Sequence, residues 1–157
     1  MLQLIKVTEE GNDLNEIRTL FKEYEYELGE NLCFQDFEKE LNDPLYKYVP
    51  PKGSLYLAKW NNETAGCIAL TPMNEEGVCE MKRLFVKPAY RKHKIGKALV
   101  EQLLKDAVEA GYTKMKLDTL KKLETAIDLY KKYEFIETTA YYHNPLSNVV
   151  YMEKVLG

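Results

Sequence analysis

The sequence has few of the residues that build metal and disulfide sites. Its 157 residues include three cysteines and two histidines. Cys33, Cys67 and Cys79 are odd in number and widely spaced, which supports neither a disulfide framework nor a CxxC-type metal motif. His93 and His143 lie far apart, and there is no HExxH pattern. We therefore predict no metal and expect the cysteines to be reduced packing residues.

The sequence also lacks a long apolar run and a strong excess of charge. No stretch approaches the roughly 20 apolar residues that a membrane span needs, and the start of the chain has no secretory signal pattern. The formal net charge is −3, with 22 Lys and Arg against 25 Asp and Glu, which argues against general nucleic-acid binding. We therefore expect a soluble, cytoplasmic protein without a membrane or nucleic-acid partner.

Apolar periodicity divides the chain into strands and helices. Helical spacing predicts helices over 14–28, 34–41, 95–108 and 126–133, and Asp13 followed by Glu16 resembles a capping box before the first of them. Strand patterns between turn signals cover 2–7, 54–60, 63–72, 78–86, 114–117, 136–142 and 149–155. The predicted order is β-α-α-β-β-β-α-β-α-β-β.

This order predicts an α/β (or α+β) fold. Hairpins come first and β-α units follow, so the sheet should be mixed and mostly antiparallel, with a parallel pair formed by 78–86 and 114–117 and helices flanking it. The length suits one domain, and there is no internal repeat or convincing linker. We expect a single domain over residues 1–157.

A basic segment joins the strand 78–86 to the long helix after it. At that helix start the backbone N–H groups lack internal partners and the dipole is positive, which favours an anion. Gly96 would let the backbone approach a phosphate closely. The sequence therefore predicts a phosphate or pyrophosphate site, and a solvated basic turn is the alternative. The cations of this segment are Arg91, Lys92, Lys94 and Lys97.

These residues resemble the GNAT acetyltransferase family, whose signature is [Q/R]-x-x-G-x-[G/A]. Arg91 stands at its first position and Gly96 at its last, while Lys94 replaces the central glycine. A positive φ angle at Lys94 would cost about 1 kcal/mol. The resemblance covers 78–135 strongly and implies acetyl-CoA as co-substrate. The implied cofactor-binding residues are Leu84, Phe85, Val86, Arg91, Lys92, His93, Lys94, Ile95, Gly96, Lys97, Ala98 and Tyr130.

The resemblance also implies how the strand 78–86 acts. This strand would splay beside the pantetheine arm, which would bind backbone groups of Leu84 and Val86. The Leu84 amide would then stabilise the oxyanion of the tetrahedral intermediate. The side chains of both residues can pack in the core at the same time, so the two interpretations are compatible.

Two further side chains match catalytic positions of the family. Tyr130, in a segment like the family's A-I-x-L-Y-x-K-x-G-F, would protonate the departing thiolate, because a phenol stays protonated at neutral pH. Packing is the alternative for this tyrosine. Glu80, four residues before Leu84, would be the general base. An ion pair between Glu80 and Lys82 or Arg83 is the alternative, with a water chain as the base.

Some positions depart from the family's pattern, and the acceptor is less defined. Glu134 replaces a glycine, and Leu123 stands where an asparagine often binds the pantetheine. The segments 24–32 and 141–145 resemble those that border the acceptor cleft. We expect acetyl transfer to a primary amine of a small-molecule or amino-acid-like acceptor in a ternary complex. A non-catalytic CoA sensor is the alternative, and a homodimer stays open.

Overall fold

A mixed sheet organises the chain, of which the computed structural model describes residues 1–30 and 36–157. Within these residues the sheet has seven strands in the order β1-β2-β3-β4-β5-β7-β6. The predicted order of elements and fold class are confirmed. The strands are β1 (Leu2–Lys6), β2 (Ser54–Trp60), β3 (Glu63–Pro72), β4 (Val78–Val86), β5 (Lys114–Leu120), β6 (Ile136–Thr138) and β7 (Val149–Val155). The helices are α1 (Asn12–Leu28), α2 (Phe37–Asn42), α3 (Ile95–Glu109) and α4 (Glu124–Lys132), with 3-10 turns η2 (Pro44–Tyr46) and η3 (Pro88–His93).

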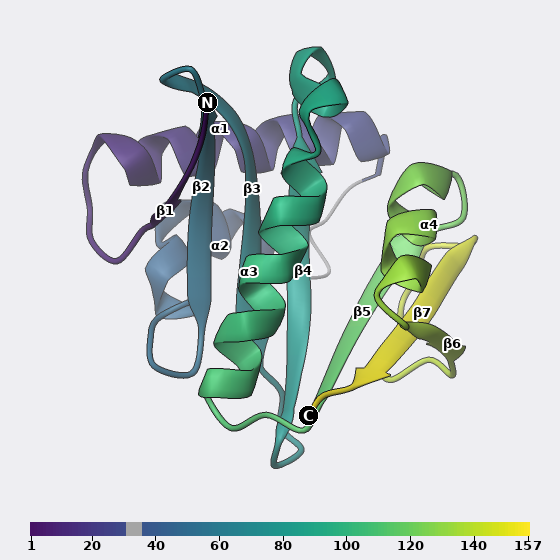
Figure 1. Ribbon diagram of the computed structural model, residues 1–157. Helices are drawn as coiled ribbons and strands as arrows, with labels where there is room; N and C mark the ends of the chain where they lie inside the picture. Colours follow the sequence, from purple (N-terminus) through teal and green to yellow (C-terminus); the bar gives the residue numbers. More distant parts are fainter. Residues whose placement is uncertain (31–35) are drawn as a thin grey trace.

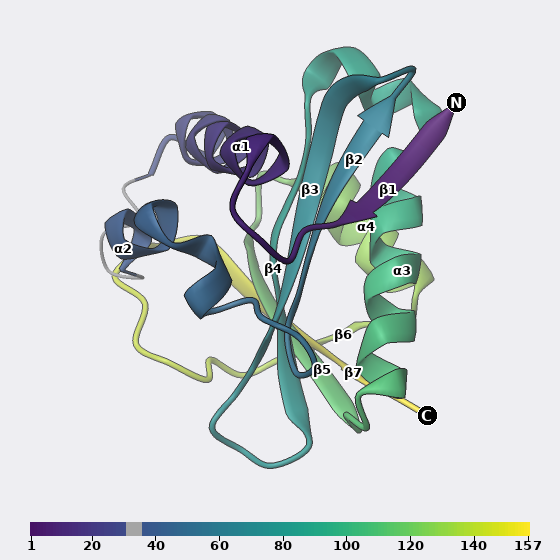
Figure 2. The same ribbon diagram turned by 90° about the vertical axis from the view of Figure 1, so that its left-hand side faces the viewer.

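Helices cover both faces of the sheet. α1 and α2 lie on one face, and α3 and α4 lie on the other (Figures 1 and 2). Along β2, Leu55 and Leu57 enter the core beneath α1, while Tyr56 and Ala58 enter the core beneath α3. Because both faces are covered, β2 and β3 are almost continuously apolar, as strands buried on two sides usually are.

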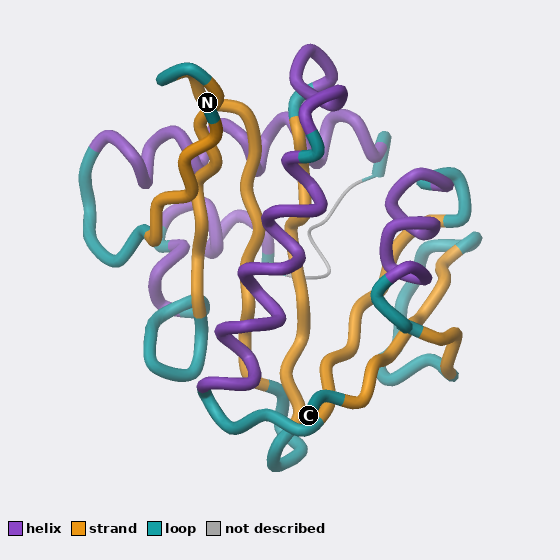
Figure 3. Tube along the Cα trace, in the orientation of Figure 1, coloured by secondary structure: helices purple, strands orange, loops and turns teal. Residues whose placement is uncertain are grey.

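β4 and β5 start side by side and then separate. Their parallel register pairs residues 78–80 with 114–116 and ends there. Beyond this point the two strands diverge, and the gap widens toward the end of the sheet at which α3 begins (Figures 1 and 3). The remaining neighbours in the sheet pair antiparallel. The predicted parallel pair is therefore present, but it is confined to one end of β4.

A β-bulge interrupts β4 at the point where it leaves β5. The register with β3 shifts between Cys67 and Ala69, and Arg83 has a left-handed backbone with φ of 61°. One extra residue in a strand changes which face the following side chains point to. Met81 and, three residues later, Leu84 therefore both pack on the α3 side. The sequence pattern did not reveal this bulge.

Three local predictions need correction. α1 begins at Asn12 with Gly11 before it and no side-chain cap hydrogen bond, so the predicted capping box is wrong. The predicted strand 136–142 is too long, because β6 ends at Thr138 and Tyr141 and Tyr142 then turn toward β4 and β5. β5 extends to Leu120, beyond the predicted end. Cys33 and Phe34 lie outside the described residues.

A buried ion pair holds the bulge against α2. Arg83 Nε donates to Glu40 Oε2 at 2.7 Å and its Nη2 donates to Oε1 at 2.9 Å, with 3% and 1% of the two side chains exposed. Burial alone would raise the pKa of the Glu40 carboxyl, but the hydrogen bonds and charge of Arg83 hold that pKa below its ordinary value. The carboxylate therefore stabilises the fold above the ordinary carboxyl pKa. This contribution is lost as the pH falls through the lowered value.

We predict that Glu40→Ala lowers the free energy of unfolding by about 3–5 kcal/mol, because it leaves the Arg83 guanidinium buried without its anion. Urea denaturation at neutral pH measures this loss. Glu38→Ala, at an exposed position of the same helix, is the matched control and should change stability by less than about 0.5 kcal/mol. Similar losses in the two variants would contradict the importance of the pair.

Candidate active site

A cleft opens where β4 and β5 separate. Its walls come from α1, β4, β5, α4 and the segment between β6 and β7. Strands that diverge leave backbone N–H and C=O groups along their facing edges, and such groups can hydrogen-bond an extended ligand. The cleft is therefore built to receive a chain-like molecule beside β4. Its polar side chains include Tyr24, Lys82, Asp118, Thr119, Tyr130 and Asn144.

The three predicted strand residues divide between the cleft and the core. Leu84 is half-buried and lines the cleft directly after the bulge. Phe85 is buried on the opposite side, where its ring meets Tyr24 edge-on with centroids 6.3 Å apart. The carbonyl of Val86 accepts a hydrogen bond from Arg91 Nε at 2.8 Å. Of these three residues, Leu84 is the one that lines the cleft, beside which its amide is predicted to act.

The chain turns sharply between η3 and α3. Lys94 has φ of 58° and ψ of 30°, so it takes the left-handed conformation that the missing glycine would favour. Gly96 follows in the first turn of α3. A Cβ added there would lie 3.6 Å from Leu129 Cδ2 and 3.9 Å from Val86 Cγ2, which are ordinary contacts. Packing within the protein therefore does not require a glycine at this position.

Two side chains of this turn, those of Arg91 and His93, contact neighbouring elements. The Arg91 guanidinium forms a two-pronged contact with Glu27 of α1, at 2.6 and 2.7 Å. His93 stacks on Trp60, with ring centroids 4.0 Å apart and planes 11° apart. Ile95 is buried in the core, so only its backbone could contact a ligand. Among the other predicted binding residues, Lys92 and Lys97 are exposed and Ala98 is half-buried.

Tyr130 of α4 is both a packing residue and a residue of the cleft wall. It is 6% exposed, and its ring contacts Phe135 edge-on with centroids 5.9 Å apart. It also lines the cleft. Burial raises the pKa of its phenol above the ordinary value, so the hydroxyl keeps its proton at neutral pH. The packing and proton-donor interpretations of this residue are therefore compatible.

Glu80 lies at the point where β4 and β5 part. Its Oε2 accepts a hydrogen bond from the hydroxyl of Tyr141 at 2.8 Å. Burial, together with the charge of Glu80, raises the pKa of Tyr141, which therefore remains a donor. Glu80 is fixed by a tyrosine from the segment after β6, a contact that its position in the sequence does not indicate. Its role as a base stays a prediction.

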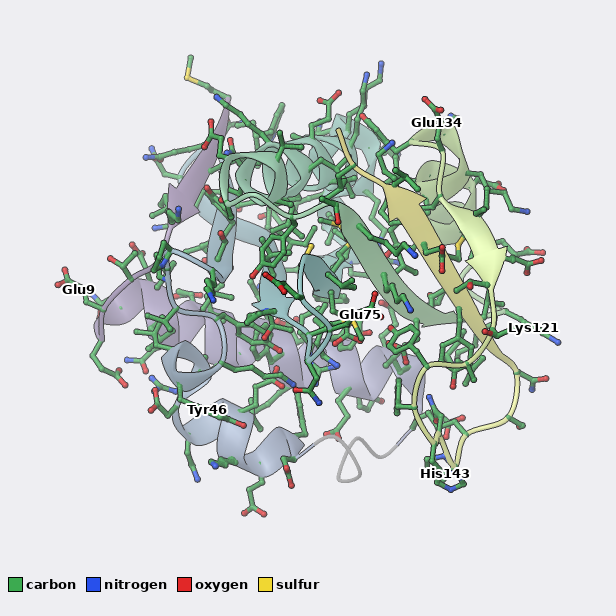
Figure 4. All side chains as sticks on the ribbon, turned by 90° about the horizontal axis from the view of Figure 1, so that it is seen from below. Glu9, Tyr46, Glu75, Lys121, Glu134 and His143 are labelled. Carbon is green, nitrogen blue, oxygen red and sulfur yellow. The ribbon has the colours of Figure 1, made fainter. Side chains whose placement is uncertain are left out.

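A second carboxylate is held in the same way, and sequence reasoning did not single it out. Asp118 Oδ2 accepts from the Tyr142 hydroxyl at 2.6 Å, and Asn144 Nδ2 donates to that hydroxyl oxygen at 2.9 Å. Asp118 stands just past the predicted end of its strand. Tyr141 and Tyr142 belong to the segment 141–145, which resembles segments that border the acceptor cleft in the family. His143, between the tyrosine pair and Asn144, is exposed at the outer end of the loop (Figure 4).

Lys82 is a buried cation of the cleft wall, next to Arg83. The residue is 9% exposed and lines the cleft two positions before Leu84. Burial lowers the pKa of its ammonium to about 8, and the nearby charge of Arg83 acts in the same direction, while Glu80 partly offsets both. Sequence reasoning treated Lys82 only as an ion-pair partner of Glu80.

Two other features bear on function. The thiols of Cys67 and Cys79 are buried, and burial raises the pKa of both, so they are protonated packing groups. Among the residues that the structure describes, no cluster of three or more His, Cys, Asp or Glu side chains could hold a metal ion. In the same part of the chain, no helix is both long and apolar enough to cross a bilayer.

The fold is shared with solved acetyltransferases. An acetyltransferase from Streptococcus agalactiae superposes with a TM-score of 0.82 at 21% identity, covering 99% of this chain and 98% of the other. The PaiA N-acetyltransferase from Thermoplasma acidophilum, solved in complex with coenzyme A, superposes with a TM-score of 0.72 at 18% identity, covering 99% of each chain. At such identities the likeness establishes the fold.

Sequence comparison extends this likeness to the family. The model of the acetyltransferase (GNAT) family matches residues 14–135. An uncharacterized N-acetyltransferase from Schizosaccharomyces pombe is 45% identical over 141 residues, which cover 89% of this chain and 86% of the relative. From the family match, this relative and the shared fold, it follows that this chain belongs to the acetyltransferase (GNAT) family and is an acetyltransferase.

Proposed function

We propose that this protein transfers the acetyl group of acetyl-CoA to a primary amine of a small-molecule acceptor by direct attack in a ternary complex. The observation that carries this proposal is the single cleft that combines the edge of β4 at Leu84 with the hydroxyl-bearing Tyr130. The strands β4 and β5 that border this cleft diverge toward the end of the sheet at which α3 begins (Figure 1). A related fold, PaiA, was solved with coenzyme A, which supports the choice of co-substrate.

The start of α3 fits the pyrophosphate of the co-substrate. Lys94 precedes α3 in a left-handed conformation, and the first N–H groups of the helix, which an α-helix cannot satisfy internally, lie at its positive dipole end. Gly96 leaves room that packing does not use. Lys92 and Lys97 are exposed and can add charge. To bind the pyrophosphate, Arg91 would either break its contact with Glu27 or contact Glu27 and the pyrophosphate at the same time.

The chemistry needs one base, one acid and one oxyanion donor. Glu80 would take a proton from the acceptor ammonium, directly or through water, and the free amine would attack the thioester carbon. The Leu84 N–H would donate to the oxyanion. Once the new C–N bond has formed, the attacking nitrogen would lose its second proton to water, and as the C–S bond breaks, Tyr130 would give its proton to the departing sulfur. The tyrosine would then regain a proton from solvent or from the base.

The proposed transfer releases one free thiol for each amine that is acetylated, and this gives a test of the activity. Acetyl-CoA should release free thiol only when an amine is supplied, at a rate that saturates with both substrates. A colorimetric thiol assay over a panel of amines and amino acids measures this. Binding of CoA without amine-dependent thiol release would support the sensor alternative and contradict the proposed transfer.

For Tyr130→Phe we expect turnover to fall roughly 10- to 10⁴-fold while KM for acetyl-CoA changes little, as for the loss of a general acid. Steady-state kinetics measures both constants. Tyr133→Phe is the matched control, because Tyr133 follows directly after the same helix and is half-buried. Unchanged turnover in Tyr130→Phe would remove this residue from the mechanism.

Gly96→Glu should weaken CoA binding by roughly tenfold or more, because a carboxylate at the start of α3 crowds and repels the pyrophosphate. Gly96→Ala is the control. Its Cβ makes only ordinary contacts within the protein, so folding should be kept, and affinity should fall less than in Gly96→Glu because a methyl group adds no charge. Titration calorimetry measures affinity, and thermal unfolding checks the fold. Tight binding by Gly96→Glu would refute the assigned site.

A further inference from the structure

The side of the cleft opposite α3 carries a buried cation that the proposed chemistry does not use. Lys82 precedes the bulge in β4, and Met81 before it points to the α3 side, so Lys82 points to the side of α1 and α2. Arg83 is on that side too, but it is committed to Glu40 through two hydrogen bonds. Lys82, which has neighbours of its own, is the second buried cation that lines the cleft on this side.

The facing strand supplies an anion at the same level. Glu80 and Lys116 form the last register pair of β4 and β5, and Lys82 and Asp118 stand two residues further along their respective strands. Both line the cleft. Asp118 is half-buried and accepts from Tyr142, which leaves further acceptor positions on its carboxylate. Besides Arg83, which is paired with Glu40, the lining of the cleft thus carries a cation on β4 and an anion on the facing strand β5.

We propose that the acceptor is an amine that also carries a carboxylate, as an amino acid does, and that Lys82 binds the carboxylate while Asp118 attracts the ammonium. This inference rests on the proposed function and names its substrate class. A charge-assisted hydrogen bond from lysine to a carboxylate is strong in a site that excludes water. A lysine ammonium has three donors, so Lys82 can keep a neighbour and still bind a ligand.

The alternative acceptor class is a purely cationic amine, such as a polyamine. A second positive group of such an acceptor would meet Lys82 in a poorly solvated wall, where like charges repel strongly. In the free protein burial and the charge of Arg83 lower the pKa of the Lys82 ammonium to about 8, and the carboxylates of Glu80 and Asp118 offset this only in part. A ligand carboxylate relieves this cost, whereas a second cation adds to it.

The test uses pairs of acceptors that differ only in the carboxylate. L-phenylalanine is compared with phenethylamine, and L-methionine with 3-(methylthio)propylamine, in wild type and Lys82→Met. We expect Lys82→Met to lower kcat/KM for the two amino acids roughly 10- to 100-fold and to leave the two amines within about threefold. Each comparison is between variant and wild type for one acceptor, so differences in amine basicity cancel.

Two further variants are compared with Lys82→Met. Lys47→Met removes a nearby lysine whose ammonium lies 4.0 Å from Glu40 and which is not in the cleft wall, so the ratio between paired acceptors should not change. Asp118→Asn should lower kcat/KM for both members of each pair, because both carry the amine. A fall of equal size for both members in Lys82→Met would indicate a structural role and would overturn the inference.

Binding separates this inference from the proposed function. Titration calorimetry with N-acetylphenylalanine and N-acetylphenethylamine needs no turnover. If wild type acetylates no amine but binds the acid more tightly through Lys82, the acid site is supported and the proposed function is wrong. If wild type acetylates amines without regard to the carboxylate and Lys82→Met changes neither binding nor the ratio, the function stands and the inference is wrong.

Discussion

The ion pair between Arg83 and Glu40 is the interaction on which the geometry of the cleft depends. A left-handed residue with a long side chain in the middle of a strand is costly unless neighbouring groups hold it. Here two hydrogen bonds, from Arg83 Nε and Nη2, fix the guanidinium to a carboxylate on α2, and the ring of Phe37 lies 5.2 Å from it. The pair thereby keeps the bulge in β4. The bulge in turn decides that Leu84 faces the α3 side while Lys82 and Arg83 face the other.

Contacts from distant parts of the chain close the site around this strand. The C-terminal end of α1 reaches the turn between η3 and α3 through Glu27 and Arg91, and it reaches the loop after β5 through the Leu28 carbonyl, which accepts from Lys122. On the other wall, Tyr141 and Tyr142 each hold one carboxylate. The proposed cofactor side and the acceptor side therefore share their supports, and a change in α1 is expected to act on both.

Local patterns predicted the architecture well because it depends on periodicity. The apolar stripes of α1 and α3 and the hairpin formed by β2 and β3 need only neighbours within a few residues. The position of the basic segment between β4 and α3 was likewise predicted from neighbouring residues. The predictions of the capping box and of the length of β6 were wrong. Glu16 accepts a hydrogen bond from Thr64 of β3, and Tyr141 and Tyr142 donate to carboxylates of β4 and β5.

The sequence by itself determined the family resemblance, the order of elements, and the candidate residues near the start of α3 and on α4. Only the tertiary structure decided which of these residues meet. The bulge at Arg83 depends on Glu40, 43 residues away, and Glu80 is held by Tyr141, 61 residues away. Burial of Lys82 opposite Asp118 arises where two strands diverge. Such long-range contacts leave no periodic signal, since each residue type there would also suit an exposed strand.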